Sequence, residues 1–292
     1  METALPDALT RALALSIDTR GLKKGSARSG SIATSRSGET YAAGSVASQT
    51  HLLDIPSELA ALVRATHHQD YAITSVDTMV SDPGVPVSPL ALKILADHAA
   101  RTGVPIRYAL YAPDGRELFT VADAQSALPF YRSGRHALTT LAKEASRPTA
   151  MVAADENVES QLKKCAFAGM TRNFPTREGA SGYGAAVLAG DDTIYFGGQY
   201  STFEERLGVH AEMGVLLHAL MSGVRDISHM GIVSSKFPDT SVAPCGACRQ
   251  FIAEVCQLYG MTPAIWCFAS VSDAHTSHSV AELLPAAWSN TL

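Results

Sequence analysis

The sequence has few of the features expected of a secreted or membrane-spanning protein. Only five of its 292 residues are cysteine and only 17% are charged, and no apolar run approaches the ~20 residues that cross a bilayer. So few cysteines in a chain of this length do not suggest a disulfide framework. The acidic segment 1–7 is unlike a signal peptide. We therefore expect a soluble protein of a reducing compartment, the cytoplasm.

The chain also has little clustered positive charge. Its net charge is −5, and the imbalance lies in residues 151–292, which carry 8 Lys and Arg against 14 Asp and Glu. A groove that follows a phosphate backbone needs clustered basic side chains, and none is evident. We therefore expect a small-molecule substrate, with neither nucleic acid nor a membrane as partner.

An internal repeat is present, since two stretches of the sequence follow the same plan. At a constant offset of 154 residues, six identities fall in one ungapped register: Gly30/Gly184, Tyr41/Tyr195, Gly44/Gly198, Glu58/Glu212, Leu62/Leu216 and Ala65/Ala219. Such a register indicates duplication. Together with the length, it predicts two domains, at residues 1–130 and 156–292, joined by a linker at 131–155 that contains a short helix at 136–146.

Strands and helices are predicted to alternate in each copy. In the second copy we expect helices at 156–171, 210–223 and 245–260, a hairpin at 184–197, and strands at 227–234 and 263–270. Strands that alternate with helices predict an α/β fold in which helices cover a sheet on both faces.

A motif of potential metal ligands occurs in the second copy. His210 and Glu212 are followed by Pro244, Cys245 and Cys248, which supply one imidazole, two thiols and a carboxylate. Three protein ligands leave one zinc position open for water, as hydrolytic sites do, whereas structural zinc sites are closed by four. The ligands fall at the beginnings of two helices, where the helix dipole favours thiolates, and we expect Arg249 to favour them as well.

The first copy has lost these ligands. When the register is shifted by two residues beyond the first helix, Pro89 and Leu92 align with the two cysteines, and Pro56 aligns with His210. None of the three can donate a lone pair to zinc. Glu58 remains, as an ordinary charge in the first turn of a helix. We therefore expect the first domain to be non-catalytic.

The order His-x-Glu followed by Pro-Cys-x-x-Cys resembles the pattern of the zinc deaminases. Residues 156–288 as a whole resemble a cytidine deaminase of the two-domain dimeric type, with the working core second rather than first. The resemblance implies tandem three-layer α/β/α domains, each with a mixed five-stranded sheet, and a homodimer of pseudo-fourfold symmetry. It also implies one Zn²⁺ per chain on His210, Cys245 and Cys248, and a function in nucleoside metabolism and pyrimidine salvage.

By the same resemblance, Glu212 is the catalytic proton shuttle in hydrolytic deamination of cytidine, deoxycytidine or a close analogue. Substrate contacts are expected from four further residues: Gln199, Phe174, Ala211 and Pro244. Cytidine deaminases carry an Asn-x-Glu pair that binds the ribose, whereas this chain reads Gly197-Gly198-Gln199-Tyr200-Ser201 there, without a glutamate in any register. This difference leaves another aminated heterocycle or modified nucleoside open as the substrate.

Other interpretations of the motif also remain open. The two cysteines could form a redox dithiol, or half of a closed structural zinc site with Cys256 or Cys267 as a further ligand. The protein would then be a catalytically idle, zinc-stabilised binding module. Retention of Glu212 beside three ligands favours the enzyme, because a structural zinc has no use for this carboxylate.

Overall fold

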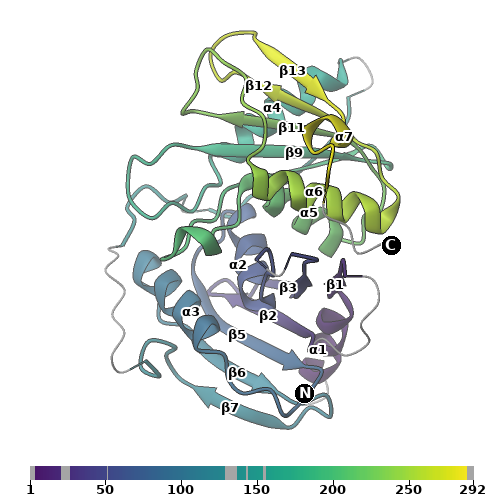
Figure 1. Cartoon of the computed structure of the whole chain (residues 1–292). Coiled ribbons are helices and arrows are strands. Elements are labelled where there is room, and N and C mark those ends of the chain that lie inside the picture. Colours follow the sequence, from purple (N-terminus) through teal and green to yellow (C-terminus); the bar gives the residue numbers. More distant parts are fainter. Residues whose placement is uncertain are drawn as a thin grey trace.

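The computed structural model describes residues 4–20, 27–50, 52–128, 137–142, 144–153 and 156–287. Two α/β halves follow one another along the chain and lie side by side (Figure 1). In these ranges no helix is long and apolar enough to span a membrane.

The first half contains three helices, with strands before and after the second of them. In chain order they are α1 (Ala4–Ala14), β1 (Ile17–Asp18), β2 (Ser29–Ser35), β3 (Thr40–Gly44), β4 (Val46–Ala47), α2 (Ser57–His67), β5 (Ile73–Val80), α3 (Pro89–Thr102), β6 (Arg107–Tyr111) and β7 (Glu117–Val121). Its main sheet has the order β3-β2-β5-β6-β7, with β5 and β6 parallel and the other pairs antiparallel. Strands β1 and β4 form a separate parallel pair.

The second half repeats this plan. In chain order it contains β8 (Thr149–Met151), α4 (Val158–Met170), β9 (Tyr183–Ala189), β10 (Thr193–Gly198), the 3₁₀ turn η1 (Glu205–Leu207), α5 (Ala211–Met221), β11 (Ile227–Ser234), α6 (Gly246–Tyr259), β12 (Ala264–Phe268), β13 (His275–His278) and α7 (Val280–Leu283). Its sheet order is β13-β12-β11-β9-β10-β8, again mixed. The predicted α/β class and the predicted elements of this half are confirmed.

Two expectations about the linker and the second sheet are wrong. Strand β8 lies inside the expected linker 131–155 and pairs with β10, so the second sheet has six strands rather than five. The expected short helix at 136–146 is absent from its described residues, 137–142 and 144–146, while 136 and 143 lie outside the described ranges. A three-residue strand that forms only by pairing with a distant strand leaves no periodic signal in the sequence.

The repeat is visible in the element boundaries. Helix α1, strand β2, helix α2 and strand β5 each begin 154 residues before α4, β9, α5 and β11. The identity Gly30/Gly184 has a steric reason: a Cβ at Gly30 would lie 2.0 Å from the backbone N of Leu13, and one at Gly184 would lie 2.0 Å from the carbonyl O of Ala166. Only glycine therefore permits the close contact between the first helix and the first sheet strand of each half.

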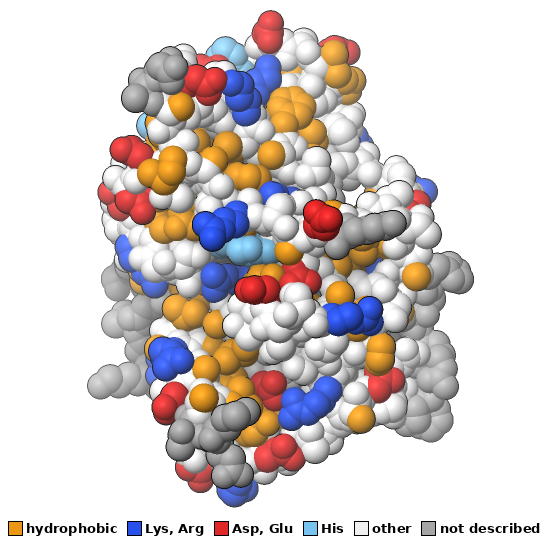
Figure 2. Space-filling model, turned by 180° about the vertical axis from the view of Figure 1, so that it is seen from behind, with side chains coloured by type: hydrophobic (Ala, Val, Ile, Leu, Met, Phe, Trp, Pro, Cys, Tyr) orange, Lys and Arg blue, Asp and Glu red, His pale blue; other side chains and the backbone are white. Residues whose placement is uncertain are grey.

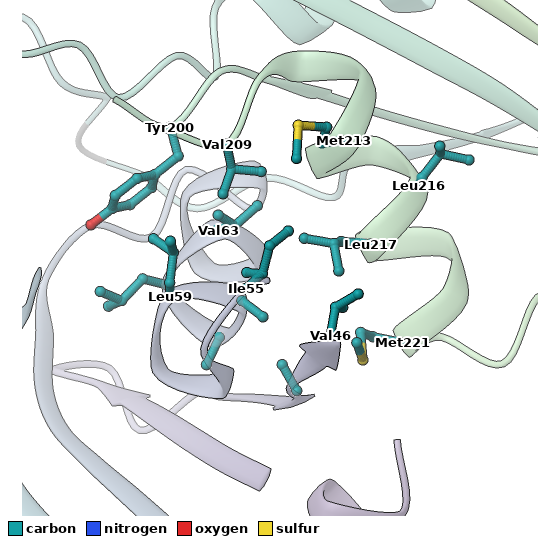
Figure 3. Close-up of a cluster of buried hydrophobic side chains, with 14 of the residues drawn as sticks. Val46, Ile55, Leu59, Val63, Tyr200, Val209, Met213, Leu216, Leu217 and Met221 are labelled. Atoms are coloured by element: carbon teal, nitrogen blue, oxygen red, sulfur yellow. The ribbon is translucent and has the colours of Figure 1, made fainter. Parts of the chain in front are cut away.

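Helices α2 and α5 form the centre of the contact between the halves. Their buried side chains meet in one hydrophobic cluster that includes Leu59 and Val63 of α2 and Met213 and Leu217 of α5 (Figure 3). The contact is reciprocal, because α2 also touches β10 and α5 touches β3. On the face opposite to that of Figure 1, acidic and basic side chains are interspersed between hydrophobic ones (Figure 2).

Candidate functional site

Three potential metal ligands converge at the beginnings of α5 and α6. His210 is the N-cap of α5, Cys245 is the N-cap of α6, and Cys248 lies in the first turn of α6. The Nδ1 atom of His210 lies 3.4 Å from Sγ of Cys245 and 3.3 Å from Sγ of Cys248, and the two sulfurs are 3.6 Å apart. Among the residues that the structure describes, no fourth His, Cys, Asp or Glu joins this group.

This donor set fits zinc. A tetrahedral site with bonds of about 2.1 Å to nitrogen and 2.3 Å to sulfur separates its ligand atoms by roughly 3.6–3.8 Å, within a few tenths of an ångström of the observed spacing. Hydrogen bonding from Cys248 and then from His210 lowers the pKa of Cys245 to about 3, which favours a thiolate there, and the same contact with Cys245 raises the pKa of Cys248.

Arg249 holds the backbone beside the cysteines. Its Nε donates to the carbonyl oxygen of Pro244 at 2.7 Å, and its Nη1 donates to that of Leu283 at 3.2 Å. The expected effect of this arginine on the thiols stays a prediction, because both of these hydrogen bonds go to the backbone. Arg249 fixes the segment that enters α6.

Glu212 is the buried carboxylate of the site. It occupies the first turn of α5, two residues after His210, and only 8% of its surface is exposed. Burial is the largest influence on it and raises the pKa of its carboxyl group. A carboxyl group with a raised pKa exchanges a proton more readily near neutral pH, as acid–base catalysis requires.

A cavity of about 320 Å³ opens onto Glu212, His210 and Cys245. This volume falls in the range of small-molecule sites. Most of the wall is apolar or aromatic, and the polar groups include Gln199 and Ser234. The remaining lining residues are Tyr183, Ile232, Val233, Phe237, Thr240, Val242, Ala243 and Phe268.

The structure places only one of the four expected substrate contacts in this cavity. Gln199 lines it, with its backbone N–H bonded to Oδ1 of Asn173 and its side chain bonded to Oγ of Ser201. Ala211 and Pro244 are buried beside lining residues but do not line it themselves. Tyr183, Phe237 and Phe268 form an aromatic wall that the motif does not predict. The position of Tyr183 next to Gly184 is its only signal in the sequence.

The expectation for Phe174 is wrong. Its ring is fully buried between the halves. The centroid of this ring lies 4.6 Å from the centroid of the His98 ring and 3.9 Å from Cζ of Arg101. Arg101 also donates to the carbonyl oxygens of Phe174 and Pro175. Phe174 therefore anchors the second half to α3, a role that the motif alone cannot distinguish from substrate contact.

The equivalent position in the first half holds no metal-ligand set. Helices α3 and α6 are related by 157 residues, so Ser88 and Ala91 stand where the second half has its cysteines. The expected alignment of Pro89 and Leu92 with the two cysteines is wrong by one residue. The connection before α6 is three residues longer than the one before α3, whereas the expected shift was two. Pro56 remains opposite His210 as the N-cap residue of its helix.

Glu58 is held by neighbouring hydroxyl groups. Tyr108 donates to its Oε1 at 2.9 Å and Thr78 donates to the same atom at 3.3 Å. Around it, Ser31 is hydrogen-bonded to both Ser57 and Thr78 at 2.7 Å. This hydroxyl network satisfies the buried carboxylate in a core that has no metal ligands beside it.

A second cavity, of about 400 Å³, lies between the halves and also touches His210. Corresponding residues of both halves line it, among them Leu59 with Met213 and Leu90 with Ala247. Its wall is mainly apolar, and Leu52 at its rim is 87% exposed.

Comparisons with known proteins agree on one group of relatives, although no family model matches the chain. A cytidine deaminase of Sporosarcina psychrophila is 36% identical over 106 residues, which cover 36% of this chain and 74% of that protein. A cytidine deaminase of Vibrio atlanticus is 38% identical over 74 residues, 25% of this chain and 22% of that protein. The crystal structure of a cytidine deaminase from Burkholderia pseudomallei matches 45% of this chain and all of its own, with 25% identity and a TM-score of 0.40.

Proposed function

Because this chain belongs to the cytidine deaminase family, we propose that it is a zinc-dependent deaminase that converts cytidine, deoxycytidine or a close analogue to the uridine product. It is a hydrolase that acts on C–N bonds. The observation that carries the proposal is the convergence of three metal ligands and one buried carboxylate on a single cavity.

His210, Cys245 and Cys248 would hold one zinc ion per chain. Their spacing supports this assignment, and so does the fact that only three such ligands meet among the described residues. When bound, zinc in such an open site supplies a water molecule of low pKa and polarises the reacting group.

Glu212 would carry the protons. Its carboxylate lies beside the ligands and lines the same cavity, so it can accept a proton from water and deliver it to the ring nitrogen of the substrate. It can then take the proton of the hydroxyl group added to the ring carbon and pass it to the departing amine. Burial supports this role, because the raised pKa of the carboxyl group lets it serve as base and then as acid.

The cavity would hold the aminated ring among its aromatic walls. Tyr183, Phe237 and Phe268 offer surfaces for a flat heterocycle, and the Gln199 amide offers both a donor and an acceptor. The substrate is accordingly a nucleoside or a molecule of similar size, in keeping with a function in pyrimidine salvage.

Only the second half of the chain would be catalytic. Residues 156–292, together with strand β8, form the catalytic domain, and residues 1–130 form a non-catalytic domain of the same fold. The replacement of all three ligand positions in the first half by Pro56, Ser88 and Ala91 supports this division.

We further propose that the protein is a cytoplasmic homodimer. The apolar cavity between the halves, with Leu52 exposed at its rim, is a surface that a second copy would cover. All five cysteines are free thiols, as is typical of a reducing compartment. Analytical ultracentrifugation of the wild type and of Leu52→Glu tests this part: a dimer that the substitution weakens is expected, and a wild-type monomer would contradict it.

A substrate screen tests the activity itself. Zinc-loaded protein should release ammonia from cytidine or deoxycytidine, and protein stripped of metal with a chelator should not. Adenosine, guanosine and free cytosine serve as comparison substrates. Release of ammonia from none of the aminated compounds, or equal rates without metal, would overturn the proposal.

A further inference from the structure

Glu254 is a fully buried carboxylate outside the proposed active site. It lies on α6, six residues and about 9 Å along the helix axis from Cys248. Its oxygens accept hydrogen bonds from three residues of the first half. The donors are Thr19 Oγ1 at 2.8 Å, Ser48 Oγ at 2.9 Å and the backbone N of Gln49 at 3.0 Å. From its own helix, Gln250 Nε2 donates to it at 3.0 Å.

The donors belong to a small, well-braced part of the first half. Strands β1 and β4 pair in parallel there, and the backbone of Val46 also pairs with that of Ile55. Arg20 donates to the carbonyl oxygen of Ser48 and forms a 3.0 Å ion pair with Asp54, which in turn accepts from the backbone N of Ser48. The hydroxyl and amide groups that face Glu254 are therefore held in place before they meet it.

The opposite contact between the halves is built differently. The residue of α3 that corresponds to Glu254 is Asp97, which forms a buried 2.8 Å ion pair with Arg101 of the same helix. Arg101 reaches across to the backbone of the second half. In the first half Arg101, held by Asp97, makes the contact with the other half, whereas Glu254 makes it directly. Only α6, the helix of Glu254, carries cysteine ligands.

We infer that Glu254 is a positioning residue through which the first half sets the geometry of Cys245 and Cys248. The inference rests on the proposed metal-binding role of the two cysteines. A buried carboxylate that accepts several braced donors fixes the helix along and around its axis, because any slide or rotation leaves a buried polar group without a partner. The non-catalytic half then contributes to the metal centre without touching the metal or the substrate.

The test uses full-length protein with Co²⁺ in place of zinc and compares Glu254→Gln with wild type. Cobalt bound by thiolates in a tetrahedral site absorbs visible light, and the bands report ligand geometry without any activity measurement. Glutamine keeps the size of the side chain but turns one acceptor into a donor that faces other donors. We expect shifted bands and roughly tenfold weaker Co²⁺ binding, the lower end of what outer partners of metal ligands contribute.

Asp97→Asn is the matched control. It also weakens a buried contact between the halves, on the helix without cysteines, so it should lower the melting temperature and leave the cobalt bands in place. Spectra are recorded well below the melting temperature of each variant. Bands and affinity in Glu254→Gln that equal those of wild type would overturn the inference, and so would the same change in both variants.

A second pair of variants covers the case in which Glu254→Gln does not fold. Ser48→Ala removes a donor from the first half alone, and Ser31→Ala removes an equally buried hydroxyl that does not face α6. We expect Ser48→Ala to shift the cobalt bands and Ser31→Ala not to, and identical spectra would overturn the inference. Absence of thiolate–cobalt bands in the wild type is a different result, because it would contradict the proposed metal site itself.

Discussion

His67, the last residue of α2, donates a hydrogen bond from its Nε2 atom to the carbonyl oxygen of Gly198 at the end of β10, with a separation of 3.0 Å. The ring lies so close to the strand that a Cβ at Gly197 would come within 2.2 Å of it. A histidine of the first half therefore covers the strand end that leads to Gln199 in the second. Buried histidines are a general feature of this contact, and they make it sensitive to acid.

Acid should weaken the folded state between pH 6.5 and about pH 4. Burial lowers the pKa of His67 to about 4 and that of His98 to about 3, and it lowers the pKa of His218 as well. Below pH 6.5 the unfolded chain binds protons that the folded chain does not, so the free energy of unfolding falls by roughly 1.4 kcal/mol per pH unit for each histidine. Above pH 6.5 this contribution to stability is fully present.

Thermal melts at pH 7.5, 6.0 and 5.0 check the acid effect. His67→Gln keeps a donor for Gly198 and should make the fall in melting temperature with acid shallower. Equal pH dependence in wild type and His67→Gln would contradict the prediction.

Removal of the first half should leave the second without a stable surface. A fragment of residues 147–292 keeps β8 but would expose Val209, Met213 and Leu217. In the full chain these side chains are covered by α2 and by the segment that leads into it, which contains Ile55 (Figure 3). Exposing each such aliphatic side chain costs about 1.5–3 kcal/mol. We expect an insoluble or inactive fragment in gel filtration and activity assays, and a soluble, fully active monomer would contradict the packing account.

Loss of a cysteine ligand should remove metal and stability together. Cys245→Ser and Cys248→Ser are expected to lose the single zinc and to melt at a lower temperature, since metal-binding energy is also folding energy. Cys256→Ser is the control, because its buried sulfur lies outside the ligand group. Zinc content by atomic absorption that stays near one per chain in Cys245→Ser or Cys248→Ser would sink the assignment, and loss of zinc from Cys256→Ser would indicate a closed structural site.

The second half could be predicted well from sequence because its signals are local. The periodic runs placed α5 and β11 correctly, and the His210, Cys245 and Cys248 spacing predicted the cluster that the structure brings together. The errors concern residues whose role is set by distant contacts. Phe174 is buried against His98 and Arg101 of α3, and β8 exists only as a partner of β10. The third extra residue before α6 becomes visible only when the N-cap residues Ser88 and Cys245 are compared in the structure.

Selectivity for the sugar should be weak. A site built to hydrogen-bond a substrate hydroxyl rejects analogues without it by about 10⁴–10⁵-fold. This chain lacks the carboxylate of the Asn-x-Glu pair, and His67 leaves no space for a side chain at Gly197. We expect kcat/KM values for cytidine, 2′-deoxycytidine and 2′,3′-dideoxycytidine to lie within about 100-fold of one another, and a preference for cytidine above ~10⁴-fold would contradict the account.

The central claim, that one half works through one buried carboxylate beside one zinc, is tested most directly by comparing Glu212→Gln with Glu58→Gln. Both glutamates lie in the first turn of corresponding helices and both are buried, so the pair differs mainly in the metal ligands nearby. We expect Glu212→Gln to keep its zinc and lose at least ~10²–10⁴-fold in kcat, and Glu58→Gln to stay within about twofold of wild type. Equal losses in the two variants, or an active Glu212→Gln enzyme, would contradict the account.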